Sequence, residues 1–274
     1  MRYNLIFFVF LLIFPGISFE ASSAATLDKE SVSELHFEAK EMFRQANELS
    51  AQAPEKAADL YKKSALRYER IIQEGGIRNG KLYYNLGNAY FRIKDIGRAI
   101  LNYLRAEQYI PDDPNLKQNL EYARGKRLDK IEEKQEIKVL KTLFFWHYDL
   151  STKARVIIFA VSFIILWSSA AVRIFIRKKF LKYLIVVSVV LSVLIAGSLT
   201  AEEVSFRKNL PGVIISDEVV ARKGNSETYE PSFKDPLHAG TEFRLLEDRG
   251  NWYRIELADA RTCWVPSKDV ETVR

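Results

Sequence analysis

Cys263 is the only cysteine in the sequence, which excludes an intrachain disulfide and a zinc site built from several thiolates. Histidine is also scarce, because His36, His147 and His238 are the only three and lie far apart. The sequence lacks the HExxH, GxSxG, GxGxxG and Walker motifs that mark metal, nucleophile and nucleotide sites. We therefore expect a non-enzymatic protein without a cofactor or a metal, and we expect Cys263 to be a buried, inert thiol.

Acidic residues are absent from residues 151–200, whereas cations are frequent there. The net charge of the chain is +6, so the remainder of the chain is close to neutral. Basic residues flank membrane spans on their cytoplasmic side, so this distribution favours a membrane protein over a nucleic-acid-binding protein. The cations of the segment are Lys153, Arg155, Arg173, Arg177, Lys178, Lys179 and Lys182.

Residues 1–24 have the layout of a secretory signal peptide. Arg2 precedes an apolar run, and Pro15 and Gly16 then lead into small residues around Ala24. The alternative is an uncleaved anchor. Both interpretations place the segment that follows outside the cytoplasm.

Two apolar stretches, residues 154–176 and 181–200, are long enough to be transmembrane helices. The basic turn between them, residues 177–180, is expected to stay in the cytoplasm. Residues 129–153 are expected to form a juxtamembrane helix and an aromatic belt that contains His147 as an interfacial residue. In the second span Ser188, Ser192 and Ala196 share one helix face, which is expected to pack against either the first span or another membrane protein. The alternative is that small residues are simply common in spans.

The stretch Gly80–Asp113 matches the tetratricopeptide (TPR) repeat, a helical hairpin of about 34 residues. The matching residues are Tyr83, Leu86, Gly87, Tyr90, Ala99, Tyr103, Ala106 and Pro111. Before it lies a degenerate helix pair in which either Tyr61 or Tyr68 fits the large-residue position of the second helix. After it, Pro114 opens a helix that is expected to cap the array. The expected TPR domain spans residues 33–128.

Concave faces of TPR arrays commonly bind extended peptides, and five residues of the clear repeat are predicted to line that face. Asn offers hydrogen bonds to a peptide backbone, while the cations and aromatic rings suit a segment that bears an acidic group. The alternative is an ordinary solvated helix face. The predicted groove residues are Lys81, Tyr84, Asn88, Phe91 and Arg92.

Residues 201–212 are expected to be a linker, after which the hydrophobic pattern changes to short alternating runs typical of a small all-β barrel. The run GNWY at residues 250–253, followed by Arg261 and Trp264, resembles the bacterial SH3 family, so residues 213–274 are predicted to form an SH3-like domain. Tyr229, Trp252 and Trp264 are a candidate aromatic patch for peptide or peptidoglycan. The alternative is that these rings belong to the core.

The order of the segments resembles the BatE family, the TPR member of the Bacteroides aerotolerance proteins. It comprises a signal peptide, a TPR that contains YYNLGNAYFRIKDIGRAILNYLRA, two spans and an SH3-like module. The resemblance implies a bacterial inner-membrane protein that works with von Willebrand A-domain membrane partners and a MoxR-type ATPase in oxygen and stress tolerance.

The sequence thus predicts a multidomain membrane protein with an all-α TPR solenoid, a two-helix transmembrane hairpin and a small all-β SH3-like barrel. Its expected function is that of a scaffold or assembly factor in the bacterial inner membrane. Both soluble domains are expected in the periplasm, where they bind protein partners and no nucleic acid. The alternative function is a cell-wall sensor or hydrolase accessory whose SH3-like domain binds peptidoglycan.

Overall fold

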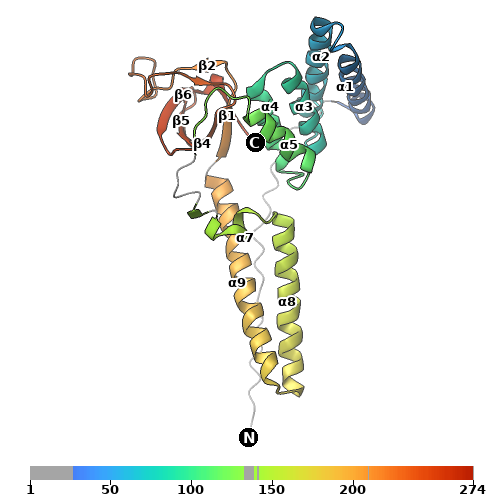
Figure 1. The fold of residues 1–274 in the computed structure, drawn as a ribbon, viewed down its shortest axis with the longest axis vertical. Helices are drawn as coiled ribbons and strands as arrows, with labels where there is room; N and C mark the ends of the chain where they lie inside the picture. The colour runs from blue at the N-terminus through green and yellow to red at the C-terminus, as the bar shows by residue number, and fades with distance from the viewer. Residues whose placement is uncertain (1–26, 133–138, 141, 209, 274) are drawn as a thin grey trace.

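The computed structural model describes residues 27–132, 139–140, 142–208 and 210–273. Figure 1 shows a group of packed helices, a sheet beside it, and a long helical hairpin that extends away from both. This mixed, multidomain layout agrees with the coarse fold class predicted from the sequence. The expected signal peptide lies outside the described residues.

The helices are α1 (Lys29–Leu49), α2 (Pro54–Gln73), α3 (Gly80–Arg92), α4 (Ile96–Glu107), α5 (Pro114–Arg124), α7 (Phe145–Tyr148), α8 (Thr152–Phe175) and α9 (Lys179–Lys208). The strands are β1 (Leu210–Ile214), β2 (Glu218–Val219), β3 (Leu237–His238), β4 (Glu242–Asp248), β5 (Trp252–Leu257), β6 (Thr262–Pro266) and β7 (Val270–Thr272).

Capping residues fix where the helices begin. The Asn79 side chain accepts a hydrogen bond of 2.9 Å from the Leu82 N–H at the start of α3. Asp113 caps α5 in the same way by accepting from Leu116 N–H at 3.1 Å, and Pro114 occupies the first helical position. Each such cap contributes about 1 kcal/mol. The predicted helix start at Pro114 is confirmed.

In the second helical hairpin, α3 and α4 approach closely at Gly87. A Cβ atom there would lie 2.6 Å from the ring of Tyr103, so only glycine leaves room for the tyrosine. The Tyr103 hydroxyl donates to Asn88 Oδ1 at 2.8 Å, and the Tyr84 ring lies 6.0 Å from the Tyr103 ring. The spacing of Gly87 and Tyr103 in the sequence therefore encodes a helix–helix contact.

The first hairpin, α1 and α2, repeats this arrangement. The Tyr61 hydroxyl donates to Asn47 Oδ1 at 2.7 Å, the Phe43 ring lies 5.2 Å from the Tyr61 ring, and Ala46 is fully buried where the second hairpin has glycine. The bonded Tyr and Asn are 14 residues apart here and 15 apart in the second hairpin. Of the two tyrosines that the sequence left open, Tyr61 is thus the equivalent of Tyr103.

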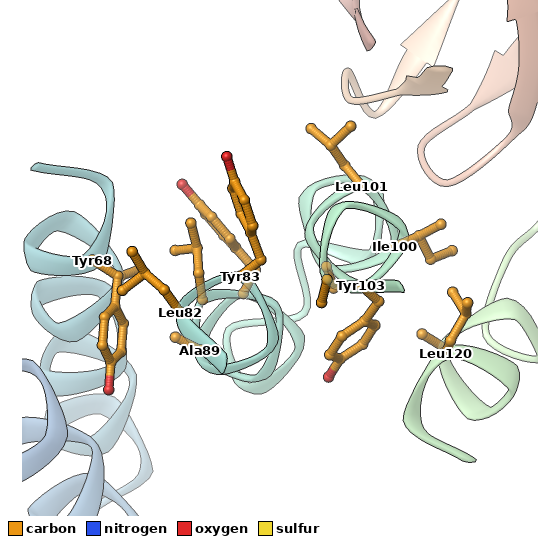
Figure 2. Close-up of a cluster of buried hydrophobic side chains, with 14 of the residues drawn as sticks. Tyr68, Leu82, Tyr83, Ala89, Ile100, Leu101, Tyr103 and Leu120 are labelled. Carbon is orange, nitrogen blue, oxygen red and sulfur yellow. The ribbon is translucent and has the colours of Figure 1, made fainter. Parts of the chain in front are cut away.

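The helical core is continuous from α2 to α5, with α4 between its neighbours (Figure 2). Tyr68, Leu82 and Ala89 fill the space between α2 and α3, and Ile100 of α4 faces Leu120 of α5. The side chain of Leu101, on the same α4, points toward the strands of the sheet. One helix therefore contributes to two contacts at once.

The sheet is antiparallel and five-stranded, in the order β6-β5-β4-β1-β7, with β2 and β3 forming a separate pair. Ile255 and Leu257 of β5 alternate into its core, as their spacing predicts, together with Ile214 and Val265. Cys263 is buried in this core, and burial raises the pKa of its thiol to about 12. The predicted burial of Cys263 is confirmed, and the raised pKa of its thiol supports the interpretation that it is inert.

The expected linker at residues 201–212 is wrong. Helix α9 continues without a break to Lys208, and β1 begins at Leu210. The residues after the apolar span include neither glycine nor proline before Pro211, so nothing in them ends the helix. Pro211 and Gly212 then lie within a strand that pairs with both β4 and β7.

Helices α8 and α9 are both long and apolar enough to cross a membrane, with mean hydropathies of 2.1 and 2.5 in their most apolar windows. Only 11% and 22% of those windows are buried inside the protein. Their apolar side chains thus face outward for most of the length of the hairpin, as lipid-facing side chains do.

The sheet is not separate from the helices, because β1 packs against α4. Val213 and Val273 are buried in the helical core cluster, and a Cβ at Gly97 would lie 2.7 Å from the carbonyl oxygen of Ile214. The two backbones therefore meet where α4 has no side chain. The sequence predicted two domains joined only through the hairpin and gave no sign of this contact.

Charged side chains surround the apolar contact. Glu242 of β4 accepts two hydrogen bonds of 2.8 Å from Arg124 and one of 3.0 Å from Arg127. Asp129 accepts from the His238 N–H at 2.7 Å and from the Thr241 hydroxyl at 2.6 Å. Burial raises the pKa of Asp129, but these bonds lower it more, so it lies below its ordinary value. The bonds to Glu242 and those to Asp129 both join the segment after α4 to the β part of the chain.

Alkaline pH should loosen the helical core. Burial raises the pKa of Tyr68 to about 12, whereas an unfolded tyrosine ionises near pH 10. The unfolded chain therefore loses this proton first, and the stability contributed by the neutral phenol is lost as pH rises from about 10 to about 12. Circular dichroism against pH should show helix loss in this window. Tyr68→Phe, which has no phenol to ionise, should show less of it; an unchanged pH dependence in this variant would contradict the assignment.

Gly97→Ala should weaken the docking of the sheet on the helices. The added methyl group favours the helix by about 1 kcal/mol. However, it would lie 2.7 Å from a backbone oxygen, which cannot give way as the end of a side chain can, and overpacking typically costs about 1–3 kcal/mol. Hydrogen exchange in β1 and α4 of the full chain should therefore become faster. Gly197→Ala is the control, since a Cβ there meets nothing within 4 Å. Equal exchange in the two variants would rule out the close contact.

Candidate functional site

The five predicted groove residues all lie on α3, and the structure places them at different depths. Lys81 and Arg92 are exposed, whereas Tyr84, Asn88 and Phe91 are half-buried against neighbouring helices. The two cations are therefore accessible to a ligand. The other three partly serve the packing of the array.

Asn88 holds neighbouring helices together. Its Oδ1 accepts one hydrogen bond from Tyr103 of α4 and a second from Asn119 Nδ2 of α5 at 3.0 Å. Asn119 Nδ2 also donates to the Tyr84 hydroxyl at 2.9 Å. The Asn88 side-chain oxygen, which was predicted to bind a peptide backbone, thus already accepts hydrogen bonds within the fold. These bonds fix α5 beside α3.

Helix α5 extends the same face with an aromatic ring that the sequence analysis missed. Tyr122 lies 5.5 Å from Phe91, ring to ring, and is 58% exposed. The ammonium of Lys126 lies 5.0 Å from the Tyr122 ring centre. The repeat length could have predicted both residues. Tyr122 lies 34 positions after Asn88, and Lys126 lies 34 positions after Arg92.

Cations thus stand over aromatic rings at two places on this side of the array. Lys126 lies over Tyr122, and the Arg92 guanidinium lies 5.8 Å from the ring centre of Tyr61 in α2. A cation held over a ring keeps hydrogen-bond donors free for a second partner such as a carboxylate. We call Lys81, Tyr84, Phe91, Arg92, Tyr122 and Lys126 the α3–α5 face.

The first hairpin has a hollow away from the predicted groove residues. A shallow cavity of about 430 Å³ is lined by Leu49 and Leu60 together with Glu55, Lys56 and Asp59. None of the predicted groove residues contributes to it. Its charges are mixed and its floor is small, so the α3–α5 face is the better candidate for a peptide.

Strand pairing and backbone hydrogen bonds connect the three residues of the predicted aromatic patch. The register of β5 and β6 puts Trp252 and Trp264 on one face, and the Arg249 guanidinium lies 5.0 Å from the Trp264 ring centre. Arg222 connects Tyr229 to this region, because its N–H donates to the Trp264 carbonyl at 2.8 Å and its Nη1 to the Tyr229 carbonyl at 2.9 Å. Tyr229 is exposed, and both tryptophans are half-buried.

A polar cluster closes the end of the hairpin nearest the folded parts. Arg155 is 2% exposed, donates to Ser198 at 2.9 Å and forms an ion pair with Glu202. His147 of α7 lies 2.8 Å from the same serine hydroxyl. The sequence indicated only that Arg155 flanks a span; its pairing with Glu202 depends on α9 continuing beyond the predicted span.

The small-residue face of α9 packs against α8. Ser192 and Ser162 lie 2.8 Å apart, oxygen to oxygen, and Ser188 and Ser169 are also buried. Of the two interpretations left open by the sequence, packing against the first span is therefore confirmed. These contacts hold the hairpin together and leave its outer surface apolar.

The described residues offer few side chains arranged for catalysis or metal binding. Within the described ranges no group of three or more His, Cys, Asp or Glu side chains is arranged to hold a metal ion. His238 lies against Asp129 at the docking contact, and His36 lies 6.0 Å from the Tyr68 ring. The expectation of a non-enzymatic protein without a cofactor stays a prediction.

Comparisons with models of protein families, with curated proteins and with solved structures found no match to this chain. The resemblance to the BatE family therefore stays a prediction that depends on the sequence motifs alone.

Proposed function

We propose that this chain is a non-enzymatic, membrane-anchored scaffold that binds an acidic segment of a partner protein on its α3–α5 face. The observation that carries the proposal is the pairing of exposed cations with aromatic rings on one side of a helical array, with Tyr122 more than half exposed. Aromatic rings supply contact area and cations supply charge-assisted hydrogen bonds, which is the chemistry of peptide capture.

The helical part is a TPR array in this proposal. The repeated bond from a tyrosine hydroxyl to an asparagine, in α1–α2 and again in α3–α4, supports two copies of one structural unit. Helix α5 then acts as the capping helix, since its buried Leu116 and Leu120 cover the last hairpin. The sheet packs on α4, which leaves the α3–α5 face uncovered.

The sheet is an SH3-like module. Its five strands and separate β2–β3 pair suit the small β architecture that the sequence motifs indicate. Since it docks on the helices through Glu242 and Asp129, we propose that the two modules present one combined surface to partners.

The hairpin is a membrane anchor, and both modules lie on the periplasmic side of a bacterial inner membrane. The support is that α8 begins and α9 ends at the end of the hairpin where the helices and the sheet lie (Figure 1). The basic turn lies at the opposite end, which suits a cytoplasmic position. Membership of the BatE family would make von Willebrand A-domain membrane proteins the partners.

Reversing the two exposed cations of α3 should remove partner binding. The double variant Lys81→Glu and Arg92→Glu turns attraction for an acidic segment into repulsion, and we expect at least a tenfold loss of co-purified partner after gentle detergent extraction. The helical circular-dichroism signal should be unchanged. The control is Lys56→Glu with Lys62→Glu, two exposed cations of α2 with the same change in charge. Equal partner recovery from both double variants would exclude the α3–α5 face.

A second candidate function is attachment to the cell wall through the sheet. It is favoured by Trp252 and Trp264 sharing one face, with Arg249 over the Trp264 ring, since aromatic faces bind sugar rings. If so, the full chain should sediment with purified peptidoglycan, and Trp252→Ala should reduce the bound fraction severalfold. Tyr109→Ala, an exposed aromatic residue of the helical part, is the control. Failure of the wild-type chain to sediment would remove this candidate.

A further inference from the structure

The turn between α8 and α9 gathers five cations around one hollow. The hollow has a volume of about 400 Å³ and is lined only by basic side chains. They come from the end of α8, the turn and the first residues of α9, namely Arg173, Arg177, Lys178, Lys179 and Lys182. The hollow brings the cations of the predicted basic turn together with Arg173 of α8 and Lys182 of α9.

These cations have no acidic neighbour on the hairpin. The sequence contains no Asp or Glu between Asp149 and Glu202, and among the described residues no ion pair to any of the five is found. The opposite end of the hairpin differs, because there Arg155 is paired with Glu202. Five like charges around one cavity repel one another, and an anion placed among them would relieve that repulsion.

Large aromatic side chains next to the lining residues in the chain are exposed. Phe175 is 86% exposed, Phe180 62% and Tyr183 71%. A ligand with a negative group in the hollow therefore has the exposed apolar side chains of α8 and α9 close by in the chain. A phospholipid combines an anionic headgroup with hydrocarbon chains, so it can contact both the cations and the apolar side chains. A soluble anion contacts only the cations.

We propose that the hollow at the tip of the α8–α9 hairpin is a binding site for the headgroup of an anionic phospholipid, whose acyl chains lie along the adjoining apolar side chains. This inference rests on the proposed insertion of the hairpin in a bilayer. It goes beyond the general attraction of basic turns to the cytoplasmic side, because a topology signal needs only charge, whereas this site selects and retains a lipid.

The test is native mass spectrometry of the full chain in detergent, with phosphatidylglycerol or phosphatidylcholine of the same chain length added. The wild-type chain should retain phosphatidylglycerol preferentially. The triple variant R177Q/K178Q/K179Q should lose that preference, with affinity falling on the order of fivefold for each cation removed. The control K56Q/K62Q/K117Q removes three exposed cations from the helical part and should behave as wild type.

Equal retention of the two lipids by wild type, or equal retention by the triple variant and the control, would overturn the proposal. Displacement of the lipid by inorganic phosphate would overturn it too, since it would identify a simple anion site. If the triple variant is not produced, K178Q and K179Q tested singly should each show the smaller, fivefold loss. Extraction of wild type from membranes by alkaline carbonate would be a failure of membrane insertion, and it is measured separately from lipid selectivity.

Discussion

The packing of β1 on α4 is the contact on which the rest of the soluble structure depends. Gly97 lets the two backbones meet, and Val213 and Val273 complete a core that otherwise consists of helices. Helix α9 ends one residue before β1, so the same strand also joins the hairpin to the sheet. The helical array is thereby held to the α8–α9 hairpin through its contact with the sheet as well as through the chain after α5. Arg124 and Glu242 add charge-assisted bonds at the edge of this contact.

This arrangement changes how the two proposed binding surfaces relate to one another. Two modules on separate tethers would meet partners independently, whereas docked modules present the α3–α5 face and the outer face of β5 and β6 in a fixed relation. The docking uses α4 and Arg124 at the end of α5. It leaves Lys81, Arg92, Tyr122 and Lys126 of the α3–α5 face exposed. The proposed scaffold function requires such a division, with one side engaged in the protein's own structure and another left for partners.

Local patterns predicted most of the elements, because they depend on residues near one another in the chain. The spacing of Gly87 and Tyr103, the position of Pro114 and the two apolar runs each identify an element. What the sequence did not indicate depends on residues far apart. Glu242 binds Arg124, which lies 118 positions earlier in the chain. Arg155 pairs with Glu202 only because α9 continues beyond its apolar stretch. In the candidate site Lys81 and Arg92 are exposed as expected. Asn88 accepts a hydrogen bond from Asn119, which the periodicity of the sequence does not predict.

The central claim is that the docked helices and sheet stand together on the outer side of a bilayer, anchored by the α8–α9 hairpin. The most direct test is protease added to intact spheroplasts that express the chain with a tag on the helical part and another on the sheet. The account predicts that both tags are lost while the hairpin is protected, and that they are lost at similar rates. Protection of either tag until the cells are lysed would contradict it.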